Sequence, residues 1–443
     1  MEQIIKIIER FIWSFPLIFI LISTHIFFTF KLKFPQLKIF NAIKYILKKD
    51  KNNKKNSINN SPIKTLMATL AGTLGVGNII GVSSAIVSSG EGVVFWIFVS
   101  GFFAIATKYA ETYIVLKYRK KDKNGKYFGG AMYVLDERLG KKMLALIFSV
   151  FVIIASFGIG CMIQSNSATI IITENFNIDI NITSIIITVI CGYVLIGNSK
   201  KIANISSILV PIASVIYISM CLLIIIKYRV NFIPMLRNIY NSAFNFKSFF
   251  YGSSYVYILN MLSTGISKGI FSNEAGIGSS PMFDATTSNS NIEEQSLISA
   301  FAVFFDTLII CMLTSVTILI TFNYVGIENA DKLINMVFSK IPYGNFFLTI
   351  SLVIFGLATI PCWCFYGETA INYIFKNKKF YNVVYKMLYI AAIFIGCKLK
   401  LSILWSISSI ANALMCIPNI YMLVKLNREI LYKSSHKLFT KMK

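Results

Sequence analysis

The chain has 443 residues, of which 56% are hydrophobic and 14% are charged, and its mean hydropathy is +0.67. This apolar content exceeds what the core of a soluble globular protein can hide, so it excludes a cytosolic enzyme. It also excludes an intrinsically disordered chain, because disorder requires low hydrophobicity. A polytopic membrane protein remains, and at roughly 30 to 40 residues per span and connection the length allows about eleven to fourteen spans.

The formal net charge is +24, from 43 lysines and arginines against 19 acidic residues. In a soluble chain this charge would suggest nucleic-acid binding, but here the basic residues concentrate in short loops between apolar runs, as membrane topology predicts. We therefore expect no nucleic-acid partner. The only two histidines, His25 and His436, are far apart, so neither histidine-ligated metal chemistry nor Ser-His-Asp catalysis is supported, and no cofactor is expected.

Apolar runs predict about eleven transmembrane helices and an all-α protein. The runs lie near residues 11–30, 62–87, 92–116, 143–172, 184–197, 203–226, 249–275, 296–322, 344–374, 381–397 and 401–424. The first run follows a charged start but precedes no small-residue cleavage pattern, so we interpret it as a retained, peripheral helix rather than a signal peptide.

The distribution of basic residues predicts the orientation in the membrane. One set of alternating loops holds 31 lysines and arginines, whereas the opposite set holds 10. Because lysine and arginine near span ends resist translocation, the richer set is cytoplasmic. We expect a multi-pass protein of the cell (cytoplasmic) membrane with its C-terminus in the cytoplasm and, for an odd number of spans, its N-terminus outside.

Two runs contain dense glycines in what should be rigid helices, at Gly72–Gly81 and at Ser263–Gly278. Each interior glycine weakens a helix by about 1 kcal/mol relative to alanine, so clustered glycines favour local unwinding. Small residues at this spacing also let helices pack closely without any substrate, and either cluster alone favours that interpretation. The two clusters together, joined to polar residues such as Asn78 and Asn273 that would be costly in lipid, favour two discontinuous helices.

These two helices each begin one half of a predicted inverted repeat, in which ten spans divide into five plus five. The expected organisation is a peripheral N-terminal helix and cytoplasmic linker at 1–61, a first five-helix repeat at 62–226, an extracellular connection at 227–248, a second five-helix inverted repeat at 249–424 and a basic cytoplasmic tail at 425–443. Matching broken helices in inverted halves indicate the midplane binding site of a secondary transporter.

Several motifs resemble the alanine or glycine:cation symporter family, also called sodium:alanine symporters. They are Gly75–Val82, Lys108–Glu111, Lys117–Arg119, Asn124–Tyr133, Gln164–Ser167, Val210–Pro211, Ser272–Ser279, Phe305–Cys311 and Tyr366–Glu368. The Ser-Asn-Glu-Ala-Gly and Gly-Gly-x-Met-Tyr strings are the most specific. The chain departs from the family pattern at Val76, where threonine is usual, at Ala131, where proline is usual, and at Phe283–Asp284, in a stretch that is usually alanine-rich.

The resemblance implies a leucine-transporter-like fold and sodium-coupled symport of a small neutral amino acid, alanine and/or glycine, into the cell by alternating access. Sodium would be the coupling ion, and the amino acid, sodium and the lipid bilayer would be the partners. A proton-coupled or differently selective amino-acid carrier of the same fold is the alternative. A membrane enzyme would need a converging nucleophile, base or metal cluster, and a channel would need pore-lining rings across subunits; neither is indicated.

The residues expected at the substrate site are Gly75, Asn78, Gln164, Phe271, Ser272, Asn273, Thr359 and Trp363. The amide of Asn78, inside the first break, can both donate to a carboxylate and accept from an ammonium group. Gln164 resembles the family position that reaches the substrate, although an interhelical hydrogen bond would explain it almost as well. Phe271 would close the pocket sterically.

Thr359 and Trp363 are spaced i, i+4 and so share one helix face, and that face resembles the pocket wall of the family. A sodium ion is expected near Gly77, Thr359 and Asp306. Glu274 fits two interpretations equally, either capping freed backbone N–H groups or binding a ligand. For Asp306, a cation pathway and a hydrogen bond from a neighbouring helix both remain open.

Overall fold

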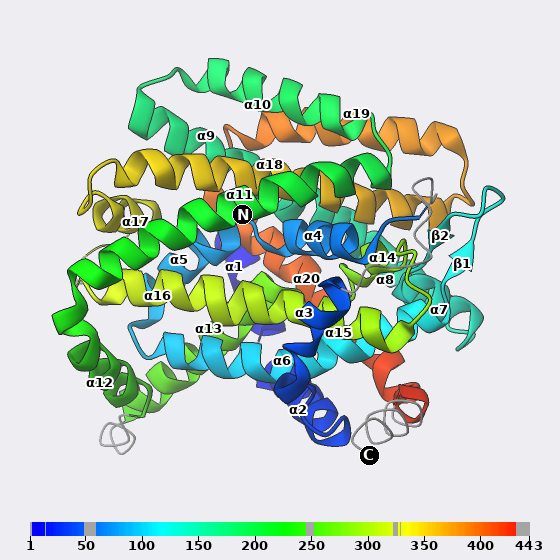
Figure 1. The fold of residues 1–443 in the computed structure, drawn as a ribbon, viewed down its shortest axis with the longest axis horizontal. Helices are drawn as coiled ribbons and strands as arrows, with labels where there is room; N and C mark the ends of the chain where they lie inside the picture. The colour runs from blue at the N-terminus through cyan, green and yellow to red at the C-terminus, as the bar shows by residue number, and fades with distance from the viewer. Residues whose placement is uncertain are drawn as a thin grey trace.

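The computed structural model describes residues 2–13, 15–47, 59–244, 252–321, 327 and 329–430, and these residues are nearly all helical (Figure 1). In the first part of the chain the helices are α1 (Glu2–Ile12), α2 (Phe15–Lys31), η1 (Pro35–Lys38), α3 (Asn41–Leu47), α4 (Pro62–Thr73), η2 (Val76–Asn78), α5 (Ile80–Ser89), α6 (Val93–Lys117), α7 (Ala131–Glu137), α8 (Lys142–Ala155), the π-helix η3 (Ser156–Met162), α9 (Ile163–Phe176), α10 (Ile180–Leu195), α11 (Ser199–Lys227), η4 (Arg229–Asn231) and α12 (Phe232–Ala243). A short antiparallel hairpin, β1 (Lys120–Lys121) with β2 (Tyr127–Phe128), follows α6.

The second part of the chain continues the all-helical pattern. Its helices are α13 (Gly252–Asn273), α14 (Pro281–Asp284), α15 (Ile292–Val303), the π-helix η6 (Phe304–Cys311), α16 (Met312–Leu319), α17 (Ala330–Phe338), α18 (Gly344–Ile374), α19 (Lys379–Gly396) and α20 (Leu401–Lys425). The predicted linker at 48–58, part of the predicted connection at 245–248 and the tail from residue 431 lie outside the described residues.

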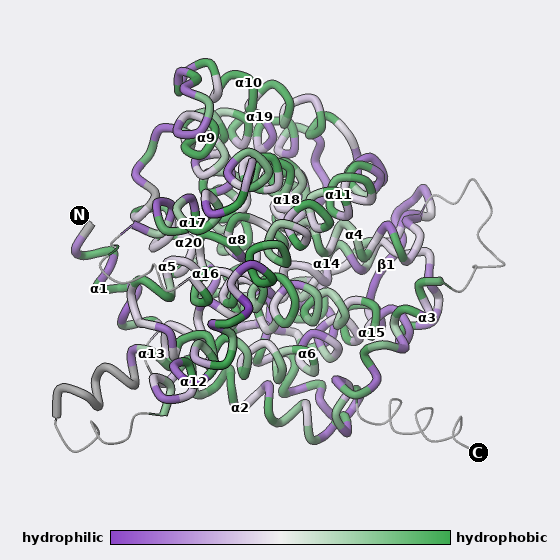
Figure 2. The backbone as a smooth tube through the Cα atoms, turned by 60° about the vertical axis from the view of Figure 1, so that its left-hand side comes forward, coloured by the Kyte–Doolittle hydropathy of each residue, from purple (hydrophilic) through white to green (hydrophobic). Residues whose placement is uncertain are grey.

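Among the described residues, seven helices are long and apolar enough to cross a membrane, and the bent pair of α4 with η2 and α5 adds an eighth. The helices α10, α13 and α19 coincide with the other three apolar runs that the sequence marks. Apolar stretches extend along most helices (Figure 2), and α10, which lies beside α19 at the edge of the bundle in Figure 1, exposes a row of isoleucine and valine side chains to the surroundings. This surface is what lipid contact requires.

The N-terminal helices α1 and α2 pack against the outside of the bundle, on α20 and α6. The indole of Trp13 donates to the carbonyl of Ser409, 3.1 Å away. On α2, the buried His25 ring shares a 2.7 Å hydrogen bond with the Thr107 hydroxyl of α6. These contacts attach the N-terminal helices to α20 and α6.

The first predicted break is confirmed. The helix α4 ends at Thr73, and α5 continues in a direction bent by 59°. Leu74 leaves the helical region with φ −76° and ψ 69°, and Gly75 is extended, with φ −105° and ψ −164°. Glycine at this point adds conformational freedom to a segment already short of helix propensity, so the chain unwinds where the glycines are densest.

The second break lies later in the chain than the sequence predicts. The helix α13 runs unbroken through Gly265 and Gly269 to Asn273, because these glycines face α6. A Cβ at Gly265 would lie 2.5 Å from the Cβ of Trp96, and a Cβ at Gly269 would lie 3.0 Å from the Ser100 hydroxyl. This pair therefore serves close helix packing, the alternative that the spacing left open.

Unwinding instead occupies Glu274–Ser280, which we call the unwound segment, between α13 and α14. Glu274, Gly276 and Gly278 have φ values of 55°, 86° and 83°. Alternating left-handed residues stop helix propagation, and glycine tolerates that region without a steric penalty.

Candidate functional site

The two broken helices meet at a buried carboxylate, Asp306, carried by the π-helix η6. The Asn78 amide donates to its Oδ1 over 2.6 Å, and the Ser272 hydroxyl donates to its Oδ2 over 2.7 Å. The neighbouring Thr307 hydroxyl also donates to Oδ2, over 2.9 Å. All four side chains are buried, so one carboxylate joins η2, α13 and η6 in the interior of the bundle.

Asn78 retains unused bonding capacity at this point. Its amide nitrogen is committed to Asp306, whereas its Oδ1 is buried and has no hydrogen-bond partner among the described residues. A buried carbonyl oxygen without a donor is costly unless a ligand or cation meets it. The π-helical turn that presents Asp306 has the wider i to i+5 pattern that recurs at functional sites, and no sequence pattern predicted it.

Gln164 braces the first break. Its Oε1 accepts from the backbone N–H of Val76 over 3.0 Å, and its Nε2 donates to the carbonyl of Ile159 in the π-helix η3 over 3.1 Å. A Cβ at Gly75 would come within 2.7 Å of that Oε1. Gly75 therefore has to lack a side chain for Gln164 to reach the unwound backbone.

Thr359 and Trp363 of α18 close the end of α4. The last carbonyls of a helix have no intrahelical donor, and these two side chains supply donors to them. The Thr359 hydroxyl lies 2.8 Å from both the Ala71 and the Phe355 carbonyl oxygens, and the Trp363 indole N–H donates to the Gly72 carbonyl over 3.1 Å. The expected shared face is present, and it contacts the freed backbone of the first break.

The rings of Phe271 and Trp405 pack against each other beside the first break, and we call this ring pair the aromatic cap. Their ring centroids are 4.9 Å apart, and a Cβ at Gly77 would lie 3.8 Å from Phe271 and 3.9 Å from Trp405. Phe271 was predicted from the sequence. Trp405 was not, because no motif or spacing marks that residue within the run at 401–424.

Asn273 ends α13 rather than pointing toward Asp306. Its Nδ2 donates to the Thr307 hydroxyl over 3.1 Å, and its Oδ1 accepts from the N–H of Ala275 over 2.9 Å. It therefore supports the transition from helix to unwound segment, while its neighbour Ser272 contacts the central carboxylate.

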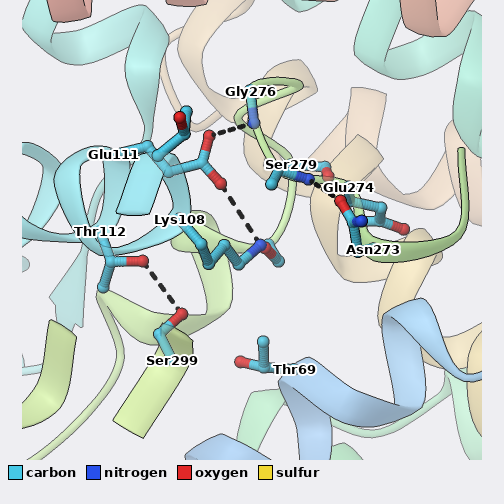
Figure 3. A network of polar contacts seen from close by, with 12 residues as sticks. Thr69, Lys108, Glu111, Thr112, Asn273, Glu274, Gly276, Ser279 and Ser299 are labelled. Carbon is cyan, nitrogen blue, oxygen red and sulfur yellow. Dashed lines mark hydrogen bonds and ion pairs between the residues drawn. The ribbon is translucent and has the colours of Figure 1, made fainter. Parts of the chain in front are cut away.

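A buried ion pair on α6 holds the unwound segment (Figure 3). Lys108 Nζ lies 3.3 Å from Glu111 Oε1, with both side chains fully buried, and it also donates to the Ser280 hydroxyl. Glu111 Oε2 accepts from the N–H of Gly276 over 3.1 Å and from the Asn419 amide over 3.0 Å. We call Lys108, Glu111 and Asn419 the α6–α20 clamp, because they fix the unwound segment from two helices.

Further acidic side chains lie in the same interior. Glu274 Oε2 accepts from the Ser279 hydroxyl over 2.5 Å, which closes the unwound segment on itself (Figure 3). Asp284 of α14, at the departure from the family pattern, accepts from the Ser299 hydroxyl over 2.6 Å. Among the described residues four acidic side chains are buried, Glu111, Glu274, Asp284 and Asp306, against one buried lysine. This surplus of acidic groups favours cation binding.

Hydrogen bonds to backbone atoms hold the chain that follows α14. Asn60, just before α4, donates its N–H to the Thr286 carbonyl over 3.1 Å and accepts from the N–H of Ser288 over 2.6 Å. The Arg119 guanidinium donates to the carbonyls of Thr287, over 2.8 Å, and Asn289, over 2.9 Å. The Asn60 contacts tie the start of the first broken helix to the chain that follows the second, and the Arg119 contacts tie the chain after α6 to the same stretch.

Beyond α20, Glu429 fastens the chain to the end of α6. It accepts from Lys117, from the Tyr118 hydroxyl over 2.6 Å and from Arg138 over 3.0 Å. Partial burial raises the pKa of Glu429, but the hydrogen bonds from these three donors outweigh it and lower the pKa to about 2.

Comparison with known proteins relates nearly the whole chain to one protein family. The pattern of the sodium:alanine symporter family matches residues 1–442. A sodium/alanine symporter, AgcS, of Methanococcus maripaludis is 32% identical over 96% of this chain and 94% of its own. A probable sodium/glutamine symporter, GlnT, of Bacillus subtilis is 31% identical over 97% of this chain and 89% of its own.

Two solved structures share the fold of this chain. MhsT in complex with L-phenylalanine superposes with a TM-score of 0.58 at 14% identity, over 82% of this chain and 88% of that one. A Na+-coupled sialic acid symporter in a substrate-bound outward-open state gives a TM-score of 0.54 at 13% identity, over 89% of this chain and 82% of that one. The predicted leucine-transporter-like fold is confirmed.

Proposed function

The chain belongs to the sodium:alanine symporter family, and on that premise we propose that it couples sodium entry to the uptake of a small neutral amino acid, alanine and/or glycine. It is a multi-pass membrane transporter of the cation-coupled amino-acid symport type and not an enzyme. The finer assignments of substrate, ion, binding residues and orientation are our proposal.

The convergence of both breaks on Asp306 carries the proposal. The cluster brings together the carboxylate of Asp306, the hydroxyls of Ser272 and Thr307, and the Asn78 Oδ1, which has no hydrogen-bond partner among the described residues. Hard cations prefer oxygen ligands of these kinds. We place the sodium ion at this cluster, where it would compensate the buried negative charge. Gly77 and Thr359 lie along the same break and would border the sodium region.

The amino acid would bind beside sodium, between the first break and the aromatic cap. Gly75, Asn78 and Gln164 would border the amino acid on the side of the first break, and Phe271, Ser272 and Asn273 on the side of α13. Thr359 and Trp363 pack against the end of α4, and their side chains are 1% and 0% exposed. A fully buried indole leaves little room, and this favours a small side chain on the substrate.

Transport would proceed by alternating access between the two five-helix halves, 62–226 and 249–424. In the proposed orientation, with the N-terminus outside and the C-terminus in the cytoplasm, the contacts of Asn60 and Arg119 close the cytoplasmic end, and they would have to separate for release. One sodium charge falling through 100 mV supplies about 2.3 kcal/mol, enough for roughly a fiftyfold amino-acid gradient.

The test is uptake of labelled alanine and glycine into proteoliposomes under a sodium gradient, a lithium gradient or a proton gradient alone. We expect accumulation with sodium, and equal accumulation without sodium would refute the coupling. Asp306→Asn should lower sodium-driven uptake by about tenfold or more, because the sodium ion would lose its contact with a charged carboxylate. Asp179→Asn is the matched control, since Asp179 is an exposed N-cap at which asparagine caps equally well.

Replacing Asn78 by alanine should abolish uptake while the protein stays folded in detergent. The variant would lose the 2.6 Å hydrogen bond to Asp306 and the free amide oxygen together. Normal uptake by this variant would remove Asn78 from the proposed site.

Proton coupling is the second candidate, and Glu274 favours it. This side chain is 1% exposed, and the Ser279 hydroxyl is its hydrogen-bond partner among the described residues. A carboxyl group in such surroundings is suited to carrying a proton. Accumulation driven by the proton gradient alone, and lost in Glu274→Gln, would support this candidate over sodium coupling.

A further inference from the structure

Lys268 is a charged side chain on α13 that the proposed sodium and amino-acid site does not use. Its Nζ lies 4.8 Å from the ring centroid of Trp405 and 5.8 Å from that of Phe271. The ammonium group therefore sits over both rings of the aromatic cap. Attraction between a cation and these ring faces is expected at such distances.

Lys268 lies closer to the Gly252 end of α13 than Phe271 and Ser272 do. It precedes Phe271 by three residues, or about 4.5 Å along the helix axis, toward the Gly252 end. Ser272, which contacts Asp306, directly follows Phe271 and lies four residues, or about 6 Å along the axis, beyond Lys268. In the proposed orientation the Gly252 end is extracellular, so an amino acid travelling inward would meet Lys268 before it reaches the cap.

The hydrogen-bonding capacity of Lys268 is unused. An ammonium group has three donors, yet Lys268 makes no hydrogen bond or ion pair with any described residue, in contrast to Lys108. Glu9 of α1 acts on it electrostatically without forming an ion pair. Ionisable side chains inside membrane helices commonly mark ligand pathways, and Lys268 has no ion-pair partner among the described residues.

We propose that Lys268 forms an outer binding site for the carboxylate group of the incoming amino acid, on the side of the aromatic cap away from Asp306. This inference rests on the proposed amino-acid transport. The positive charge would repel sodium and attract the carboxylate of the zwitterion. The amino end would then lead toward the buried acids, and separation of Phe271 from Trp405 would admit the substrate to the inner site.

The first test is the concentration dependence of uptake. Lys268→Gln should raise KM for alanine by about tenfold, because one charged donor to the carboxylate is lost, with Vmax within twofold of wild type. Lys268→Arg should restore KM. Lys398→Gln is the matched control, since Lys398 Nζ lies 4.4 Å from the Phe394 ring on an exposed part of the chain. An unchanged KM, or a KM that arginine does not restore, would overturn the proposal.

The second test does not require transport. Sodium propionate carries the carboxylate without the amino group, and it should alter tryptophan fluorescence through Trp405. The change should vanish in Lys268→Gln and in Trp405→Phe but persist in Lys398→Gln. If the wild type fails to accumulate any amino acid, the proposed function fails, whereas this titration still decides the outer site. A propionate response that is the same with and without Lys268 would refute it.

Discussion

Replacing Lys108 by methionine should destabilise the folded protein strongly. The change removes one member of an ion pair whose atoms are 3.3 Å apart and fully buried. At that distance two unit charges attract by about 5 kcal/mol for an effective dielectric constant of about 20. Glu111 would remain buried with the donors Gly276 and Asn419 only.

Breaking a buried pair by removing one partner typically costs about 3 to 5 kcal/mol, because the remaining charge is uncompensated. At about 2 °C per kcal/mol, the unfolding temperature should fall by about 6 to 10 °C. The Ser280 contact is lost as well, so the unwound segment should loosen and uptake should fall.

All eight cysteines are buried, so a thiol-reactive fluorescent dye reports unfolding directly. Lys120→Met is the control. Lys120 forms an ion pair with Glu137, and the two side chains are 40% and 49% exposed. Such an exposed pair contributes less than about 1 kcal/mol to the free energy of unfolding. Adding Glu111→Gln to Lys108→Met should recover most of the lost stability, since no lone charge remains. An unfolding temperature for Lys108→Met equal to that of the control would refute the reasoning.

Three further outcomes are expected. Trp363→Ala should admit bulkier amino acids, because it removes a fully buried indole and its 3.1 Å bond to the Gly72 carbonyl. Competition of larger amino acids with alanine uptake measures this. A substrate range equal to that of the wild type would show that Trp363 does not border the pocket. Gly265→Leu should lower the yield of folded protein, since even a Cβ would lie 2.5 Å from Trp96; normal size-exclusion behaviour would contradict this packing. Glu429→Gln should lower the unfolding temperature at neutral pH. Because folding lowers the pKa of Glu429 to about 2, its contribution is complete above the ordinary value near 4.5. The difference from wild type should therefore shrink as the pH falls below 4.5, and a constant difference would count against the anchor.

Sequence patterns were reliable where a local property decides the structure. The glycines around Gly75 unwind the chain where they are densest, and Thr359 with Trp363 share a helix face because their spacing imposes it. These features need no knowledge of neighbouring helices.

Other features depend on contacts between distant segments, and local patterns did not identify them. Glycines at 265 and 269 resemble an unwinding signal, yet α6 packs against them and the helix persists. Trp405 joins the aromatic cap although 134 residues separate it from Phe271. The roles of Gln164 and Asn273 likewise came from their bonding partners, since an amide side chain can brace backbone or bind substrate equally well.

The sequence by itself determined that this is an all-helical membrane protein of a symporter family, because hydropathy, basic loops and motif strings are properties of consecutive residues. The tertiary structure alone decided where the second helix unwinds and which polar groups meet Asp306. In an apolar bundle, polar groups that leave water must find partners from other helices, and only the packed arrangement shows which partners those are.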